Sequence, residues 1–189
     1  MFGRLTYYFQ RFILKRLISE QRRYFDNILV PRYAVGGKRI LFIGIEWYNR
    51  WIFHKYKAAQ WVSIDPFESN RKFGAKDHLV GKFPDDINIE DNVATFDVVF
   101  CNGVYGWGVN SETGLEYVMQ NITSILKPNG ICIFGYNTAE RNNPVAQETL
   151  FNIITRSLIL ENKEQVRITN ETHDKHIFCI LRKAREMPR

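Results

Sequence analysis

Cysteine is scarce in this sequence, and the positions of the few cysteines exclude a disulfide framework. The 189 residues contain Cys101, Cys132 and Cys179, an odd number without paired spacing. Each of them lies in an apolar run that is typical of a strand. Such thiols are usually buried and stay reduced inside cells. We therefore expect no disulfides and a cytoplasmic location.

The chain also lacks an apolar run long enough to span a bilayer. Residues 1–26 carry apolar side chains near helical spacing, which predicts an amphipathic helix. Arg11, Lys15 and Arg16 interrupt it, so no stretch of about 18 apolar residues remains. No small-residue cleavage pattern follows, so we expect no signal peptide. This helix is expected either to pack on the domain, as a lid over the substrate side, or to contact a partner or an anionic membrane peripherally through residues 1–30.

Net positive charge is absent from most of the chain. The net charge is +6, but residues 1–39 hold nine basic and two acidic residues, a net of +7. The other 150 residues hold 17 basic and 18 acidic residues, a net of −1. A duplex-binding domain needs a basic surface across its binding face, so we expect no nucleic-acid partner.

Internal repeats, low-complexity segments and long linkers are absent as well. A chain of this length is large enough for one well-buried core and too short for two ordinary domains. We predict an N-terminal basic amphipathic helical extension over residues 1–35 and a single domain over residues 36–189.

Strand-like and helix-like segments alternate after residue 38, which predicts an α/β fold with a doubly wound, mostly parallel sheet and helices on both faces. The run at 96–103, FDVVFCNG, is the strongest strand signal, because its apolar residues are continuous. Other strands are predicted at 39–44, 61–65, 78–81, 131–137 and 176–183, with a weaker one within 157–169. Helices are predicted around 51–56, at 111–126 with Ser111 as cap, and at 144–156, and a turn at Lys127–Gly130.

The strand at 39–44 opens a loop that carries a single glycine. The sequence there is ILFIGIEWYN, in which Gly44 ends the strand. Nucleotides often bind at such a turn. The second and third glycines of a dinucleotide fingerprint are missing, with Glu46 and Asn49 near their places. A nicotinamide-dependent dehydrogenase is therefore only a third, weaker hypothesis.

These segments together resemble the class I S-adenosylmethionine (SAM)-dependent methyltransferases. The resemblance covers roughly residues 38 to 137 and depends on the glycine-ended first strand, Asp65 at the end of the second, FDVVFCNGV, and ILKPNGICIFGYN. EWYN and CNGVYGWG look like a small bacterial branch of methyltransferase-like proteins with a degenerate glycine motif. The resemblance implies a Rossmann-like, seven-stranded sheet with an antiparallel last strand. It also implies SAM bound across the carboxyl ends of strands one, two and four.

The same resemblance implies a set of cofactor-binding residues. Asp65 matches the acid that binds the ribose hydroxyls, although a turn-capping role at Pro66 is the alternative. Glu46 is expected to accept a hydrogen bond from the cofactor's ammonium group, or else to face solvent or pair with Arg50. Three positions depart from the family pattern: Phe42, Glu46 and the pair Gly81–Lys82. The full predicted cofactor-binding set is Gly44, Glu46, Trp47, Asp65, Pro66, Asn102 and Gly103.

Two further groups of residues bear on the chemistry. Tyr105 and Trp107 follow the fourth strand among glycines, and we expect them to hold the substrate or shield the sulfonium, with plain packing as the alternative for Trp107. His173 and His176 lack the spacing and the third ligand of a zinc site, so we expect a solvated loop and no metal.

The sequence therefore predicts a SAM-dependent methyltransferase acting on a small molecule, a sugar, or a glycan or lipid precursor. Methyl transfer depends chiefly on positioning the acceptor in line with the sulfonium, so catalytic residues are not assigned. The alternative is a catalytically silent, methyltransferase-like binding module.

Overall fold

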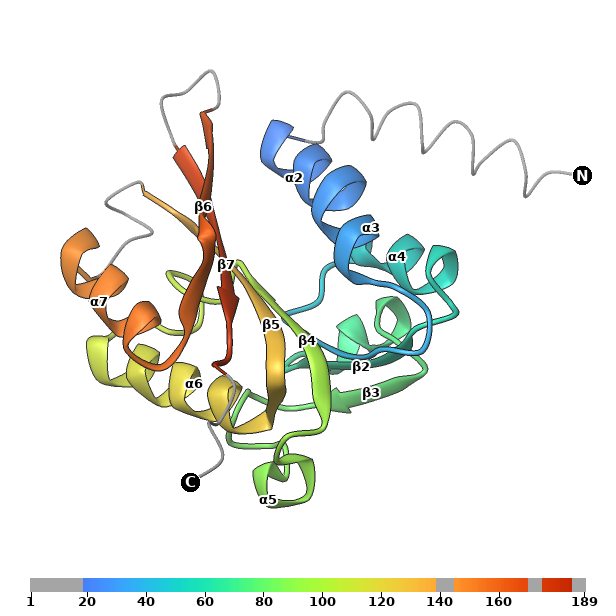
Figure 1. Cartoon of the computed structure of the whole chain (residues 1–189). Coiled ribbons are helices and arrows are strands. Elements are labelled where there is room, and N and C mark those ends of the chain that lie inside the picture. The colour runs from blue at the N-terminus through green and yellow to red at the C-terminus, as the bar shows by residue number, and fades with distance from the viewer. Residues whose placement is uncertain (1–18, 139–144, 170–174, 185–189) are drawn as a thin grey trace, which may run out of the picture.

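The computed structural model describes residues 19–138, 145–169 and 175–184 as one sheet with helices on both faces (Figure 1). Within these residues, no helix is long and apolar enough to cross a membrane. The helical elements are α2 (Glu20–Tyr24), the π-helix η1 (Phe25–Leu29), α3 (Val30–Tyr33), η2 (Trp47–Asn49), α4 (Arg50–Lys55), η3 (Glu68–Phe73), α5 (Ile89–Asn92), α6 (Glu112–Ile125) and α7 (Gln147–Ser157).

The sheet has seven strands in the order β3-β2-β1-β4-β5-β7-β6. The first five of these run parallel to one another, whereas β7 runs antiparallel to both β5 and β6. This confirms the predicted α/β class, the seven strands and the antiparallel last strand. The strands are β1 (Arg39–Ile43), β2 (Gln60–Asp65), β3 (Asp77–Val80), β4 (Phe96–Asn102), β5 (Leu126–Asn137), β6 (Ile159–Thr169) and β7 (Lys175–Arg182).

The central strands are apolar at successive positions because both of their faces are covered. Along β1, Ile40 and Phe42 pack into the core on the side of α3 and α4, whereas Leu41 and Ile43 pack into the core on the side of α6 and α7. Helix α6 adds its apolar face to the second core, and the Ser111 hydroxyl caps it by accepting a hydrogen bond from the Gly114 N–H at 3.1 Å.

Residues 25–33 contribute buried side chains to the core of the domain. Phe25 is fully buried, and its ring lies 5.5 Å from that of Phe100, 5.9 Å from that of Phe178 and 6.0 Å from that of Phe42. Leu29 and Val30 are also fully buried. The part of the predicted extension that the structure describes therefore covers one face of the sheet, while residues 1–18 lie outside the described residues.

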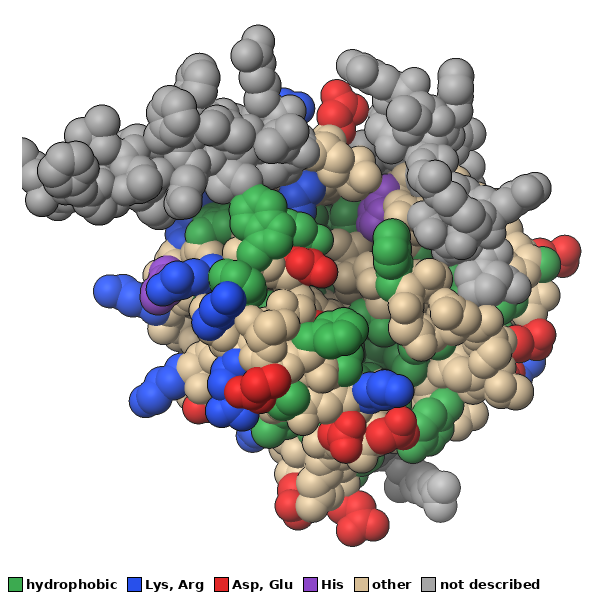
Figure 2. Space-filling view, turned by 180° about the vertical axis from the view of Figure 1, so that it is seen from behind, with side chains coloured by type: hydrophobic (Ala, Val, Ile, Leu, Met, Phe, Trp, Pro, Cys, Tyr) green, Lys and Arg blue, Asp and Glu red, His purple; other side chains and the backbone are tan. Residues whose placement is uncertain are grey.

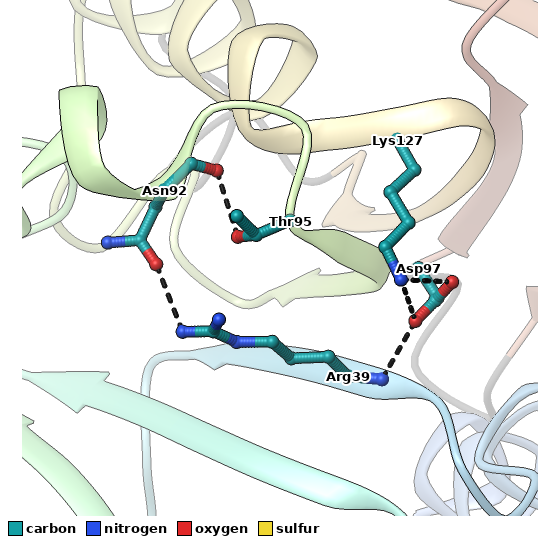
Figure 3. A network of polar contacts seen from close by, with 5 residues as sticks. All are labelled: Arg39, Asn92, Thr95, Asp97 and Lys127. Atoms are coloured by element: carbon teal, nitrogen blue, oxygen red, sulfur yellow. Dashed lines mark hydrogen bonds and ion pairs between the residues drawn. The ribbon is translucent and has the colours of Figure 1, made fainter.

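A polar network joins the amino ends of β1, β4 and β5 (Figure 3). The Asp97 carboxylate accepts hydrogen bonds from the Arg39 backbone N–H and from Lys127 Nζ, each at 2.9 Å. Arg39 Nη2 also donates to Asn92 Oδ1 at 3.2 Å. The pKa of Asp97 lies below its ordinary value because these bonds outweigh its partial burial. This network fixes the edge of the sheet opposite to the carboxyl ends.

The structure corrects the start of the fifth strand. The predicted turn at Lys127–Gly130 lies within β5, because Leu126 already pairs with Phe96 before the register shifts. Asn129 has a φ of 62°, a left-handed conformation that fits an interruption inside the strand. The other elements predicted after residue 38 lie within a few residues of the observed ones.

Candidate functional site

The turns after β1 and β4 lie side by side at the carboxyl edge of the sheet. Gly44 and Gly103 have φ values of 81° and 76°, which non-glycine residues rarely adopt. A Cβ on Gly44 would meet the Val104 side chain at 3.3 Å, whereas a Cβ on Gly103 would meet nothing within 4 Å. The two turns are therefore adjacent, and there is free space beside Gly103.

Asp65, at the end of β2, is only 5% exposed and joins the turn after β1 to the segment that follows β2. Its Oδ2 accepts from the Ile45 N–H at 2.8 Å, and its Oδ1 accepts from the Phe67 N–H at 2.9 Å and from Asn70 Nδ2 at 3.0 Å. Asn70 Nδ2 also donates to the Ile45 carbonyl at 2.7 Å. A carboxylate has about four acceptor positions, so one position, on Oδ2, remains for a ligand. The turn-capping role foreseen at Pro66 is present, and Pro66 itself is exposed.

Glu46 and Trp47 form the turn between β1 and α4. The Glu46 N–H donates to Asn49 Oδ1 at 2.7 Å, which begins the short helix η2. Its side chain is exposed, as is that of Trp47, whose ring packs against Tyr48 at 5.4 Å. Glu46 and Asn49 form a capping box, in which the side chain of each accepts from the backbone N–H of the other. This box fixes the backbone in place of the missing glycines, and the exposed Glu46 carboxylate keeps further acceptor positions.

Three side chains meet at the ends of β4, β5 and β7. His176 Nδ1 lies 2.7 Å from Asn137 Oδ1, and His176 Nε2 lies 2.9 Å from Asn102 Oδ1. His176 was predicted in a solvated loop, and this was wrong: it lies in β7, pairs with Asn137 and is 6% exposed. Burial lowers the pKa of His176 to about 4. The only sequence signal was its position at the first residue of the predicted strand 176–183. His173 lies outside the described residues.

A largely buried ion pair brings the N-terminal helices to the turn after β1. Arg22 Nη2 lies 2.7 Å from Asp26 Oδ1. The Arg22 guanidinium also stacks on the rings of Tyr48, at 4.3 Å, and Phe25, at 5.2 Å. Burial raises the pKa of Asp26 even though Arg22 opposes the shift. The i,i+4 spacing of Arg22 and Asp26 is a local signal for this pair. Nothing local to residues 22–26 indicates the contact of Arg22 with Tyr48.

Tyr105 and Trp107, both predicted near the substrate, lie in different environments. Tyr105 is buried, packs against Phe134 and Tyr136, and its hydroxyl accepts a hydrogen bond from the Val145 N–H at 2.9 Å. Tyr105 is therefore packed in the core, and we assign it to support of the turn. Trp107 is 69% exposed and remains a candidate for substrate contact.

Exposed aromatic residues follow three neighbouring strands of the sheet. Trp47 follows β1, Phe67 follows β2 and Trp107 follows β4. Seen from behind the view of Figure 1, the molecule has a hollow near its middle with hydrophobic side chains gathered around it, and Lys and Arg side chains are concentrated to one side (Figure 2). Aromatic rings at a carboxyl edge can stack on a planar ligand or cover its apolar parts.

The cysteines take no part in this edge. All three are free and buried, and burial raises the pKa of Cys101 to about 12. In the register of the sheet, Cys101 of β4 and Cys179 of β7 both align with Phe134 of β5. Among the described residues, no group of His, Cys, Asp or Glu side chains is arranged to hold a metal ion. The predicted buried, reduced thiols are confirmed.

Comparison with solved structures identifies the architecture. The chain superposes on the N-methyltransferase NodS from Bradyrhizobium japonicum WM9 with a TM-score of 0.63 and 16% identity, covering 87% of this chain and 96% of NodS. For a TehB-like SAM-dependent methyltransferase from Corynebacterium glutamicum, the TM-score is 0.65 at 17% identity, covering 94% and 97%. The fold is that of the SAM-dependent methyltransferases.

A third solved structure with this fold carries bound ligands. The 1,6-didemethyltoxoflavin-N1-methyltransferase from Burkholderia thailandensis, with its substrate and S-adenosylhomocysteine (SAH), superposes with a TM-score of 0.62 at 11% identity, covering 84% of this chain and 76% of that chain. No protein-family model matches the sequence. An uncharacterized protein, RP028, from Rickettsia prowazekii (strain Madrid E) is 29% identical over 89 residues, 47% of this chain. The match spans 31% of that relative's length.

Proposed function

We propose that this protein is a SAM-dependent methyltransferase that acts on a small molecule, a sugar, or a glycan or lipid precursor. The observation that carries the proposal is the gathering of Asp65, Glu46 and Asn102 at the carboxyl edge of a methyltransferase-type sheet. Ligands of open α/β sheets bind at this edge. The likeness to NodS supports the assignment, since NodS has also been solved in complex with SAH.

The residues at this edge fit the cofactor. Asp65 has one acceptor position left for a ribose hydroxyl, and the exposed Glu46 carboxylate can accept from the cofactor's ammonium group. The free space beside Gly103 leaves room for a ligand between the turns after β1 and β4. Gly44, Trp47 and Pro66 would flank it.

When bound, SAM supplies an electrophilic methyl group on a sulfonium. The protein's own contribution is to hold the acceptor atom in line with that methyl group and to exclude water. Asn102 stands at the end of β4, where the acceptor would approach, and Trp107 can cover the acceptor from outside. No strong base is required of the chain for an acceptor that is already nucleophilic.

One observation favours the second candidate, a catalytically silent binding module from a small branch with a degenerate glycine motif. Three of the four acceptor positions of Asp65 are occupied by the protein itself, where a ribose-binding acid would offer two to the hydroxyls. Glu46 also stands where the family has its second glycine. Both features would weaken the cofactor site without altering the fold.

Calorimetric titration with SAH separates the two candidates. We expect saturable binding of one SAH per chain at micromolar to low millimolar concentration. No heat of binding at millimolar SAH would favour the silent module. A parallel titration with NADH serves as control, because tight NADH binding would instead support the dehydrogenase hypothesis.

We further propose that the protein works in the cytoplasm and that, within residues 1–30, the segment before the buried Phe25 gives it a peripheral contact with a membrane. The three free thiols fit a reducing compartment. Residues 1–18 carry four basic and no acidic residues among aromatic and aliphatic ones, a composition that suits an anionic surface.

A further inference from the structure

The ring of His176 is held in a built polar site between two amides. Asn137 lies beside it as its cross-strand partner on β5, and Asn102 reaches it from β4. The ring also packs on Phe178, with the centroids 4.5 Å apart. The imidazole therefore has a fixed orientation and both of its nitrogens are engaged.

Gly135 makes this arrangement possible. It is the register partner of Asn102 in β5, so the Asn102 side chain lies over a position that has no side chain of its own. A Cβ there would collide with Asn102 Oδ1 and would lie 2.9 Å from His176 Nε2. A glycine within this buried strand thus leaves the space that the contact between Asn102 and His176 occupies.

The hydrogen-bonding capacity of imidazole limits how the two amides can be oriented. A neutral ring has one N–H donor and one bare nitrogen acceptor. Its N–H therefore faces an asparagine Oδ1, whereas its bare nitrogen needs the Nδ2 of the other asparagine. Both amides place Oδ1 beside the ring. One of them must therefore turn by 180°, which exchanges Oδ1 and Nδ2 without changing the shape of the side chain. Burial keeps the ring neutral, since it lowers the pKa of His176 to about 4.

We propose that His176 is a positioning residue that holds the side-chain amides of Asn102 and Asn137 in opposite orientations. One amide then presents its NH₂ group to the methyl acceptor, and the other presents its carbonyl oxygen. This inference rests on the methyl transfer proposed above. It assigns the acceptor to a chemical class: a neutral nucleophile with an N–H or O–H, such as an amine, amide or hydroxyl. The carbonyl oxygen accepts a hydrogen bond from the acceptor's N–H or O–H, which leaves a lone pair of the acceptor free to face the methyl group. The proton that the methylated acceptor loses passes to solvent.

The same arrangement disfavours a carboxylate as acceptor. A carboxylate offers only acceptor oxygens, so one of them would face the outward carbonyl oxygen and repel it. A protonated His176 would reverse this preference, because both asparagines would then turn Oδ1 to the ring and present two NH₂ groups outward.

Nitrogen-15 NMR tests the orientation directly. In protein labelled at histidine and asparagine, we expect the His176 ring at pH 7 to show one protonated and one bare nitrogen, in a single tautomer. A doubly protonated ring, or two tautomers in comparable amounts, would overturn the proposal.

Acetamide and acetate are matched probes for the site, because they have nearly the same shape and only acetamide has N–H donors. We expect acetamide to shift the side-chain amide signals of Asn102 and Asn137 at a concentration at least about fivefold lower than acetate, the scale of one hydrogen bond. In His176→Phe, which keeps an aromatic ring against Phe178, the ratio should fall below about twofold. Absent responses, equal responses, or tighter acetate in the wild-type chain would overturn the proposal.

The design separates the inference from the function on which it rests. SAH is titrated in its own experiment, and only its failure to bind removes the methyltransferase proposal. The probe titrations are run on the protein alone and again with SAH added. If His176→Phe fails to fold, the ring signals and the probe ratio of the wild-type chain still decide the matter.

Discussion

Glu46 lies in the turn after β1 with its backbone N–H bound by Asn49 and its carboxylate exposed. Replacing it with glutamine removes the charge and leaves the turn intact. If the carboxylate accepts a hydrogen bond from the cofactor's ammonium group, Glu46→Gln should weaken SAH binding by roughly 1.5–3 kcal/mol. Calorimetry measures the loss, and urea unfolding should show no change in stability.

Glu90, an exposed acid in α5, supplies the matched control for this prediction. Glu90→Gln makes the same chemical change at a site outside the turns at the carboxyl edge, so SAH affinity should stay at the wild-type value. An equal effect of both variants, or none from Glu46→Gln, would leave Glu46 with the solvent-facing role considered from the sequence.

His176 makes stability depend on pH in a defined window. Its folded pKa of about 4 lies below the unfolded value of 6.5, so the unfolded chain binds more protons between these values. Stability therefore falls as the pH drops from 6.5 to 4, by up to about 3 kcal/mol. Urea unfolding at pH 7 and pH 4.5 should show a smaller loss in His176→Phe than in the wild-type chain. Parallel losses in the two proteins would contradict the burial of a neutral ring.

Among the secondary-structure elements, η1 has the clearest energetic role. Phe25 is fully buried against rings of β1, β4 and β7, whereas Ile28 in the same helix is 50% exposed. Phe25→Ala should lower the free energy of unfolding by about 3–5 kcal/mol, the usual range for a buried phenylalanine. Ile28→Ala should change it by less than about 0.5 kcal/mol. A loss from Phe25→Ala as small as that from Ile28→Ala, in denaturant unfolding, would mean that this helix is an appendage.

The strands could be predicted from the sequence because burial on both faces requires apolar residues at successive positions. Runs such as FDVVF are apolar at successive positions, and α6 shows a helical period after a capping serine. The start of β5 could not be predicted, since it depends on Leu126 pairing with Phe96 across the sheet. Local patterns carry no information about such a partner.

The candidate site was predictable to the same extent. Asp65 and Asn102 each end a strand, and the carboxyl ends of parallel strands meet at one edge of the sheet. Their proximity therefore followed from the predicted topology. His176 was missed because its polar sequence neighbours suggest a loop, while its burial comes from Asn102 and Asn137, far away in the sequence. Asn70 was missed for a similar reason, as its amide bridges the ends of two strands.

On the scale of the whole molecule, the uneven charge predicts where a membrane would be touched. A chain beginning at residue 19 keeps Phe25 and all of α2, and it loses the four basic residues of the first 18. Each basic residue near an anionic surface contributes about 1 kcal/mol, and salt weakens the effect. The full-length protein should therefore sediment with phosphatidylserine vesicles, and the shortened chain should stay in solution.

Neutral phosphatidylcholine vesicles are the control for this experiment, since they lack the charge that attracts the segment. Equal sedimentation of the two chains with anionic vesicles would rule out the membrane contact. Loss of methyl transfer on the same truncation, without any vesicle binding, would favour the lid.

The three cysteines of β4, β5 and β7 make opening of the central sheet measurable by thiol labelling. They lie on adjacent strands in the middle of the sheet and are shielded from solvent. A small aromatic disulfide reagent can reach them only when these strands separate, and it then releases a coloured product. The labelling rate under native conditions therefore counts opening events of the central sheet. Fraying of the outer helices would not expose these thiols, and a ligand that holds β4 and β5 together would lower the labelling rate.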